Sequence, residues 1–407
     1  MSHWLQVAIT LSFLWYWGTA GSIGQTTSSE DQPLLTFVVF TDAHVFDDGW
    51  KQALDSRFRY ISDDWRALHW AVGEINDLVR ADERIDFVVY DGDLGLQNVD
   101  LEKDCKVAPL GLDVESVPVI PSTWAVRQIA LELNTLAVNT IYFVPGNNDL
   151  VNEAVTDASR HGCFIKLLQS ELASFSPPSP VRVTALGARN SATVNGIQVA
   201  GLNSASFKVL KNYQRDCPAA GGGCPTWEIA SLQTLIGTSS HLQLLLFTHV
   251  PDLKDPYRKA PAWDVPAGVR TSWEKFACNP SVLAIFAGHF HDADRNLYGT
   301  TSGTRNLTVS GCVAAKTWVT PPLALKNQSD SKPGARGLLL VKVFKGGRIA
   351  VTVHWFDNPN TATLPKAASN RTLLWILCSV FTIVLVFTLF VVMVRRAASS
   401  STAAGSA

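Results

Sequence analysis

Two histidines separated by a single residue follow a short apolar run. Residues 282–287 (Val-Leu-Ala-Ile-Phe-Ala) carry no polar side chain, which predicts a buried strand, and Gly288 allows a tight bend after it. His289 and His291 then leave the strand end together. Burying two imidazoles at one point costs free energy unless they bind something, because neutral rings need hydrogen-bond partners and charged rings repel. The pattern indicates a metal site, although an isolated His-x-His is more often a pair of ordinary histidines.

Other apolar runs upstream also end in side chains that bind metals. In open α/β sheets ligands gather at the carboxyl ends of the strands, so residues far apart in the sequence are expected to meet at one edge. Each cluster alone is weak evidence, but five in a row at strand ends are hard to explain by chance. The clusters are Asp42 and His44 after 34–41, Asp93 after 85–90, Asn147 after 140–144, His249 after 242–247, and His289 with His291 after 282–287.

The elements that must position these residues alternate between strand and helix patterns. This alternation predicts α/β layers, and a hairpin near the end, turned at Gly346 and Gly347, indicates a mixed sheet or two sheets. Pocket-lining loops are expected over 97–121, 203–226 and 251–275. The other expected elements are helices over 62–80, 124–138, 163–175 and 227–236, and strands over 197–202, 306–310, 338–344 and 348–355.

Composition excludes some classes of protein. The chain has 407 residues, 47% of them hydrophobic and 17% charged, which is enough for one large domain or two small ones. Lys and Arg number 34 against 35 Asp and Glu, with no basic stripe. We therefore expect no binding to a nucleic-acid scaffold.

Both ends of the chain carry apolar segments of different lengths. Residues 1–24 resemble a signal peptide, and 372–394 match one membrane crossing, followed at once by Arg395 and Arg396. Because a basic pair marks the cytoplasmic side, we predict a single-pass type I membrane protein whose main domain is extracellular, lumenal or periplasmic. The predicted parts are a signal peptide (1–24), a domain (33–358), a linker (359–371), a membrane helix (372–394) and a cytoplasmic tail (395–407).

Cysteines and sequons are consistent with this location. Cys378 lies in the predicted span, and an even number of cysteines remains outside it, which favours disulfide bonds whose pairing the sequence leaves open. Sequons at Asn306, Asn327 and Asn370 predict a glycoprotein if the host glycosylates. The cysteines outside the span are Cys105, Cys163, Cys217, Cys224, Cys278 and Cys312.

The ordered motifs Asp-x-His, Gly-Asp, Gly-Asn-x-Asp, His and Gly-His-x-His resemble those of the calcineurin-like dinuclear metallophosphoesterases, over roughly residues 34–356. Segments 201–204 and 248–251 are similar to the acid-sphingomyelinase-like and endopolyphosphatase-like branch. The resemblance implies two packed mixed β-sheets flanked by helices, a four-layer αββα fold, to which the sequence adds one C-terminal transmembrane helix.

The resemblance also implies a pair of divalent cations. By matching position, one metal takes Asp42, His44, Asp93 and His291, and the other takes Asp93, Asn147, His249 and His289, so that Asp93 bridges them. Imidazole and carboxylate ligands suit Zn, Fe or Mn, and we expect Zn. Asn203, in the first of the two similar segments, is a candidate substrate contact or an ordinary strand-end turn residue.

One position departs from the family pattern. The family usually has Gly-Asn-His followed by an acid, whereas this chain has Asn148 before Asp149. Asn148 donates a hydrogen bond but supplies no proton near neutral pH. Asn148 and Asp149 are nevertheless the candidate catalytic residues, because the ligand set is intact. Asp47, Asp48 and Asp292 are candidate partners of the ligating imidazoles, while His69, His161, His241 and His354 are expected to be structural or solvated.

The function predicted on these grounds is that of a hydrolase. We expect an extracytoplasmic phosphoesterase that hydrolyses a phosphodiester or phosphoanhydride by metal-bound hydroxide, as a sphingomyelinase-like phosphodiesterase or a polyphosphatase. Its substrate is then a phosphorylated small molecule, a lipid or polyphosphate. The alternative is a catalytically weakened scaffold that acts as a binding or receptor ectodomain, which Asn148 favours.

Overall fold

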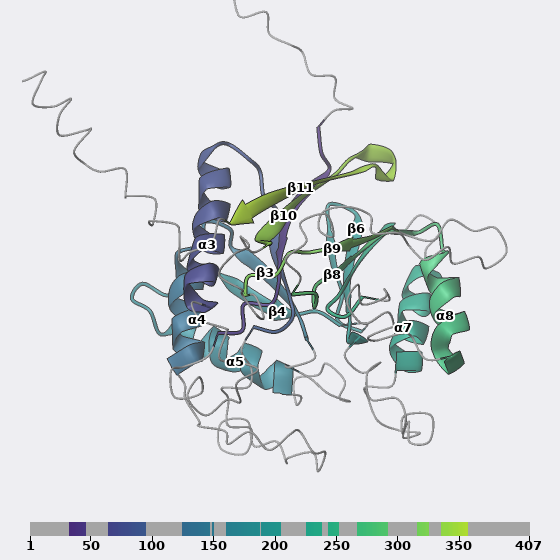
Figure 1. Cartoon of the computed structure of the whole chain (residues 1–407), viewed down its shortest axis with the longest axis horizontal. Helices are drawn as coiled ribbons and strands as arrows, with labels where there is room; N and C mark the ends of the chain where they lie inside the picture. The colour runs from purple at the N-terminus through teal and green to yellow at the C-terminus, as the bar shows by residue number, and fades with distance from the viewer. Residues whose placement is uncertain are drawn as a thin grey trace, which may run out of the picture.

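The computed structural model describes residues 32–45, 64–94, 124–146, 149, 160–187, 189–204, 225–237, 243–251, 267–291, 316–324 and 335–356. Within these ranges the chain forms two β-sheets with helices on both sides of the pair (Figure 1). The predicted α/β class with two mixed sheets flanked by helices is confirmed.

The first sheet has six strands. They are β1 (Leu35–Phe40), β2 (Phe87–Asp91), β3 (Thr140–Val144), β4 (Arg182–Ala185), β10 (Arg336–Val343) and β11 (Ile349–Phe356). Their order across the sheet is β11-β10-β1-β2-β3-β4. β1 to β4 are parallel, and the β10–β11 hairpin extends the sheet on the other side of β1 in antiparallel register.

The second sheet has five strands. They are β5 (Ala192–Val194), β6 (Ile197–Leu202), β7 (Gln243–Thr248), β8 (Val282–Ala287) and β9 (Lys316–Val319). They follow sequence order across the sheet, and β6 to β9 are parallel. The parallel strands of each sheet therefore have their carboxyl ends at one edge, where the predicted ligands lie.

Alternating side chains of the buried strands divide the core into layers. In β1, Leu35, Phe37 and Val39 pack between the sheets, whereas Val38 and Phe40 face the helices. Because both faces of such a strand are covered, its sequence is a continuous apolar run rather than an alternating one. This is why the sequence predicted the strands at 140–144, 197–202 and 282–287 with their observed bounds.

Helices cover the outer face of each sheet. Three of them share the outer core of the first sheet, and two share that of the second. The helices on the first sheet are α3 (Asp64–Arg80), α4 (Trp124–Asn134) and α5 (Arg160–Ala173), and those on the second are α7 (Pro225–Gly237) and α8 (Ala267–Ala277).

An aromatic group joins the two sheets. Phe37 stacks on Phe87 of its own sheet, with ring centroids 5.0 Å apart. It meets Phe247 and Phe286 of the other sheet edge-on at 5.6 and 5.5 Å. The Phe37 side chain therefore fills the space between the sheets directly below the strand ends.

Replacing Phe37 by alanine is expected to lower the free energy of unfolding by about 3–5 kcal/mol, because the other three rings cannot close the cavity. Urea unfolding followed by circular dichroism measures this change. Leu131→Ala is the control, since Leu131 is 42% exposed and its removal should change stability by less than about 0.5 kcal/mol. Equal effects of the two substitutions would contradict the role given to Phe37.

The structure corrects some of the expected boundaries. Residues 267–277 form α8, although 251–275 were expected to be a loop, because Trp273, Phe276 and Ala277 are spaced to pack against α7. The strands β4, β5 and β9 were not predicted, since each is four residues long or shorter and has no continuous apolar pattern. The predicted strand at 306–310 lies outside the described residues.

The predicted membrane segments also lie outside the described residues. In the part of the chain that the structure describes, no helix is long and apolar enough to cross a membrane. The signal peptide, the span at 372–394 and the three sequons fall in other parts of the sequence. Cys163 lies in α5 and Cys278 follows α8, while the remaining cysteines lie outside the described residues. The expected disulfide bonds therefore stay a prediction, and their pairing stays open.

Candidate metal centre

The predicted ligands meet where β1, β2, β7 and β8 end, and each of these strands leads into an irregular backbone turn. Asp42, His44, Asp93 and His289 have φ angles of 55°, 46°, 58° and 71°, in the left-handed region that non-glycine residues seldom adopt. Such strain costs about 1–3 kcal/mol per residue and tends to gather at functional sites. Its concentration at these residues marks the edge as a site built for their side chains.

Backbone hydrogen bonds hold these turns together. The amide of Asp42 donates to the Gly92 carbonyl at 3.0 Å, and that of His44 donates to the Asp93 carbonyl at 2.9 Å. The Tyr90 hydroxyl joins the same two turns, accepting from the Ala43 amide at 2.8 Å and donating to the Asp93 carbonyl at 3.1 Å. The ends of β1 and β2 are thus fixed to each other by backbone hydrogen bonds and by the Tyr90 hydroxyl.

Asp42 occupies the middle of the site and is fully buried. Its Oδ2 accepts hydrogen bonds from the Thr41 hydroxyl and from the His289 amide, both at 2.9 Å. Its Oδ1 lies 3.0 Å from His291 Nε2 and 3.6 Å from the Nε2 atoms of both His44 and His249. One oxygen is therefore held by the protein while the other is directed at three imidazoles.

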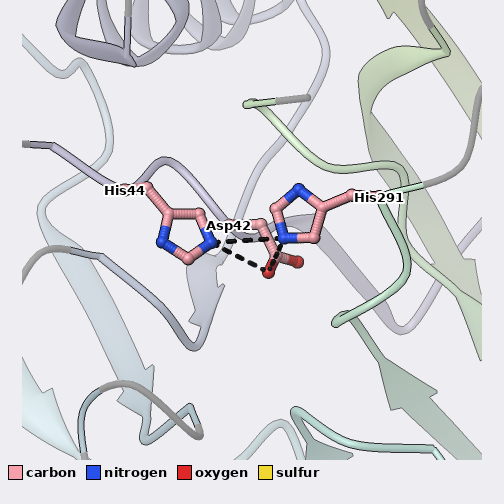
Figure 2. A group of neighbouring side chains, drawn as sticks. All are labelled: Asp42, His44 and His291. Atoms are coloured by element: carbon pink, nitrogen blue, oxygen red, sulfur yellow. Dashed lines mark hydrogen bonds and ion pairs between the residues drawn. The ribbon is translucent and has the colours of Figure 1, made fainter. Parts of the chain in front are cut away.

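Asp42, His44 and His291 form one group of potential ligands (Figure 2). The Nε2 atoms of His44 and His291 lie 3.2 Å apart, and each faces Oδ1 of Asp42. His291 Nδ1 contacts the Ala324 carbonyl at 2.6 Å. A carbonyl only accepts, so Nδ1 carries the proton and Nε2 of the neutral ring offers a lone pair to the centre.

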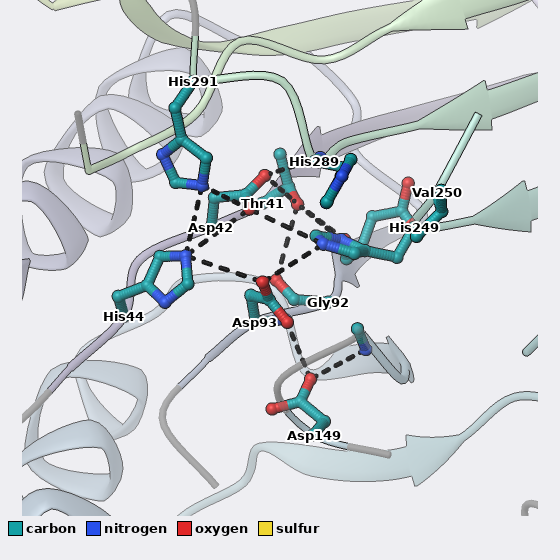
Figure 3. Close-up of polar contacts among 12 residues, drawn as sticks. Thr41, Asp42, His44, Gly92, Asp93, Asp149, His249, Val250, His289 and His291 are labelled. Atoms are coloured by element: carbon teal, nitrogen blue, oxygen red, sulfur yellow. Dashed lines mark hydrogen bonds and ion pairs between the residues drawn. The ribbon is translucent and has the colours of Figure 1, made fainter. Parts of the chain in front are cut away.

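Asp42, Asp93 and His249 form a second group beside the first (Figure 3). Asp93 Oδ2 lies 3.3 Å from His249 Nε2 and 3.6 Å from His44 Nε2, so this carboxylate reaches both groups. His249 Nδ1 contacts the Asp91 carbonyl at 2.6 Å, which again directs Nε2 at the centre. The bridging position that the resemblance implied for Asp93 agrees with this geometry, and Asp42 reaches both groups as well.

The donor set fits a cation. Asp42 Oδ1 and His249 Nε2 are buried and have no hydrogen-bond partner in the described part of the chain. Carboxylate oxygens and neutral imidazole nitrogens that converge have no proton to share, so only a positive charge satisfies them together. The residues placed to hold one or two such ions are Asp42, His44, Asp93, His249, His289 and His291.

The electrostatics of the bare site agree with this interpretation. Burial alone would lower the pKa of His249, but the carboxylates of Asp93 and Asp42 outweigh it and raise that pKa to about 10. Burial likewise opposes the charge on Asp42, yet the histidines facing it hold its pKa well below the ordinary value. A field that stabilises a proton on His249 this strongly would stabilise a metal cation in its place.

His289 lies beside His249, and its backbone amide donates to Asp42. Its ring centroid is 5.5 Å from that of His249 (Figure 3). Burial, together with the positive charge of His249, lowers the pKa of His289 to about 3. A neutral His289 at physiological pH has the lone pair that a metal ligand needs.

Asp149 supports the site from below. Its Oδ2 accepts from the amides of Asp93 and Gly146 at 2.8 and 2.9 Å, so it ties the turn after β3 to the backbone of Asp93 (Figure 3). Burial and the neighbouring Asp93 raise its pKa to about 6. Asp149 therefore positions Asp93, whereas Asn147 and Asn148 lie outside the described residues and their roles stay predictions.

The other candidates fall in different places. Asn203 is fully buried and follows β6, whose last residue pairs with Thr248, so it lies beside His249 at the strand ends. His69 bonds Glu132 and His354 bonds Glu74, away from the site, as expected of structural or solvated histidines. Asp47, Asp48, His241 and Asp292 are not among the described residues.

His161, in the first turn of α5, is buried and belongs to neither group of potential metal ligands among the described residues. Burial lowers its pKa to about 3, and its Nδ1 has no hydrogen-bond partner among the described residues. Because the folded state holds His161 neutral, it should contribute stability above pH 6.5 that is lost as the pH falls towards 3. The loss between pH 7 and pH 4.5 is expected to be about 3 kcal/mol.

Urea unfolding of the chelated protein at these two pH values tests the expectation for His161. The variant His161→Leu should show a smaller pH dependence than the original chain, and the exposed control His69→Gln should show the same dependence. An unchanged pH dependence in His161→Leu would contradict the assignment.

Several residues that build the site were not predicted. The Thr41 hydroxyl lies 2.5 Å from the Asp91 carbonyl and 2.9 Å from Asp42 Oδ2, and the Ala324 carbonyl orients His291. Asp91 is buried, and burial raises its pKa to about 8, which keeps this carboxyl neutral. Gly288 is needed because an added Cβ would overlap the Thr41 side chain. The sequence had indicated only a tight bend at Gly288. The only sequence signal for Thr41 was its place before Asp42.

Comparison with solved structures finds only distant similarity, with TM-scores below 0.5 and low sequence identity. A putative 5′-nucleotidase from Staphylococcus aureus is 10% identical with a TM-score of 0.38, and the match covers 84% of this chain and 58% of that protein. The calcineurin-like phosphoesterase YfkN from Bacillus subtilis is 11% identical with a TM-score of 0.40, and the match covers 79% of this chain and 90% of that protein. A purple acid phosphatase from yellow lupin is 12% identical with a TM-score of 0.39, and the match covers 80% of this chain and 54% of that protein.

Sequence comparison gives a firmer result. No curated protein matches the chain. The family model described as calcineurin-like phosphoesterase matches residues 35–293, which contain every predicted metal ligand from Asp42 to His291. The chain therefore belongs to the calcineurin-like phosphoesterase family.

Proposed function

We propose that this chain is an extracytoplasmic, metal-dependent phosphoesterase that hydrolyses a phosphodiester or a phosphoanhydride. The observation that supports it most is the convergence of Asp42, Asp93 and His249 with His44 and His291 on one buried centre. No thiol or hydroxyl nucleophile of the chain is required. A divalent cation held there supplies Lewis-acid charge for the phosphoryl group and lowers the pKa of a water molecule.

The protein's own residues prepare the site for this chemistry. The carbonyls of Asp91 and Ala324 fix the tautomers of His249 and His291, so that Nε2 of each faces the centre. Asp149 accepts from the backbone amide of Asp93 and so holds the turn from which the Asp93 carboxylate projects. Preorganisation of this kind lowers the reorganisation needed when charge develops on the phosphoryl oxygens.

The location and the substrate type are further parts of the proposal. The predicted signal peptide and the charge-free stretch at 373–394 support placement outside the cytosol with one membrane anchor. The resemblance of segments 201–204 and 248–251 to the sphingomyelinase-like and endopolyphosphatase-like branch supports a phosphocholine lipid or polyphosphate as substrate.

A substrate panel with metal analysis tests the proposed function. The full chain in detergent is analysed for bound Zn, Fe and Mn and assayed with bis(p-nitrophenyl) phosphate, polyphosphate and phosphocholine lipids. We expect at least one divalent metal per chain and a hydrolysis that a chelator abolishes. A protein that binds no metal, or that is inactive on the whole panel with metal bound, would overturn the proposal.

A second candidate is a binding or receptor ectodomain on a weakened enzyme scaffold. The observation that favours it is Asn148, because an amide cannot protonate a leaving oxygen. Asn148→His separates the two candidates in the same assay. A large gain from an inactive background supports the weakened scaffold, whereas little change from a good rate supports an enzyme that works with asparagine.

A further inference from the structure

The path of the last strand gives the domain an orientation. We propose that the metal centre faces the membrane in which the chain is anchored, and that the substrate is a phosphoester in the headgroup of a lipid in that bilayer. This inference rests on the proposed function and on the predicted span at 372–394, and it goes beyond both by fixing which edge of the domain meets the lipid.

The strand register places the end of β11 at the edge where the metal centre lies. Val39 of β1 pairs with Leu339 of β10, the last pair between these two strands. Beyond it residues 322–324 lie between them, since the amides of Leu323 and Ala324 donate to the carbonyls of Thr41 and Asp42, and the amide of Gly337 donates to that of Pro322. Arg336 in turn pairs with Phe356, the last residue of β11. Three strand spacings therefore separate Phe356 from Asp42 across the sheet, or roughly 14 Å.

Side-chain contacts fix this end of β11 to the site and to the neighbouring helix. Trp355 packs against the cluster of Phe290, Val319 and Ala335, and Phe290 is the residue between the two histidines of the metal centre. Phe356 stacks on Trp70 of α3 with ring centroids 4.5 Å apart. The chain therefore leaves the described domain beside His289 and His291 and not from its opposite edge.

The segment between this exit and the predicted span is short. Only the 15 residues from 357 to 371 separate Phe356 from the start of the span. Even fully extended they reach about 50 Å. The opposite edge, at the β10–β11 turn, is the length of β11 away, or about 24 Å. If that edge faced the membrane, residues 357–371 would first have to run back along the domain, which would use about half of their maximum length.

The proposed orientation favours some of the proposed substrates over others. Headgroup phosphates lie in the plane that a membrane-facing edge meets, so their local concentration at the metal centre is high without any dedicated binding energy. Soluble polymers such as polyphosphate would have to enter the gap between the domain and the bilayer. The geometry therefore favours a lipid phosphoester over polyphosphate.

The helix α3 provides a way to measure the orientation, because it runs beside β11. Its contacts proceed from Trp70 with Phe356 through Glu74 with His354, and Glu83 just beyond its end reaches Lys342. Arg66, one turn before Trp70, is thus exposed near the edge of the metal centre. Lys345, in the β10–β11 turn (η4, Lys345–Gly347), is exposed at the opposite edge.

The first experiment measures energy transfer from a fluorescent amino acid to acceptor-labelled lipid headgroups. The full chain, reconstituted in lipid vesicles, carries the donor in place of Arg66 or, as the matched control, in place of Lys345. We expect clearly stronger transfer from position 66, matching a height difference of about 24 Å. Equal transfer from the two positions, or stronger transfer from position 345, would overturn the orientation whatever the activity of the protein.

The second experiment tests the lipid substrate. An insertion of about 20 Gly and Ser residues after Pro359 lengthens the tether without touching the described domain. In vesicles it should lower the turnover of a phosphocholine lipid in the same bilayer at least about threefold and leave turnover of bis(p-nitrophenyl) phosphate unchanged. Unchanged lipid turnover, or none in the original chain, would contradict the substrate. Loss of bis(p-nitrophenyl) phosphate hydrolysis in every sample would instead contradict the proposed function.

Discussion

Asp93→Asn is expected to remove both bound metal and phosphoester hydrolysis. The carboxylate of Asp93 faces His44 and His249, and like Asp42 it reaches both halves of the centre. An amide has nearly the same shape but no charge, so it cannot offset the charge of a cation bound by the imidazoles. We expect turnover to fall at least about 1,000-fold, which corresponds to about 4 kcal/mol of lost transition-state stabilisation.

The measurement pairs metal content with the rate of bis(p-nitrophenyl) phosphate hydrolysis. Asp77→Asn is the matched control, since the same chemical change falls on an exposed side chain of α3 that pairs with Arg80. The control should keep its metal and its rate, because an exposed ion pair contributes little. If Asp93→Asn retained both, the assignment of this centre as the site of hydrolysis would be wrong.

Gly92→Ala is expected to damage the same centre through the backbone. Gly92 has a φ of +89°, and a Cβ added there would overlap the imidazole of His249 and the backbone of Gly146. Its carbonyl also accepts the hydrogen bond from the Asp42 amide. We expect metal affinity and turnover to fall by more than about 100-fold, with about 1–3 kcal/mol lost from the free energy of unfolding.

Gly73→Ala is the control for this substitution. Gly73 lies within α3, its φ is not positive, and nothing comes within 4 Å of an added Cβ. Alanine should therefore stabilise the protein by up to about 1 kcal/mol and leave activity unchanged. Metal titration and thermal unfolding of the two variants measure the contrast. Full activity in Gly92→Ala would show that His249 does not need its observed position.

The sequence by itself determined the order of the strands that lead to the site and most of the ligands at their ends. Both sheets are covered on both faces, so β8 is a continuous apolar run and β3 and β6 are predominantly apolar, with Gln198 inside β6, and the sequence shows these patterns directly. The parallel arrangement of these strands then places their following residues at one edge. His289 and His291 were recognisable for that reason, without knowledge of any contact.

Only the tertiary structure decided how the ligands share the centre and what orients them. The central position of Asp42 depends on turns more than 200 residues apart in the sequence, and the carbonyl that orients His291 belongs to Ala324, 33 residues further along the chain. The exit of the chain beside the metal centre depends likewise on the pairing of β1 with β10 and of β10 with β11. Local sequence patterns report which faces of an element are buried, whereas register between distant strands is set by packing of the whole core, so these features had no signal in the sequence.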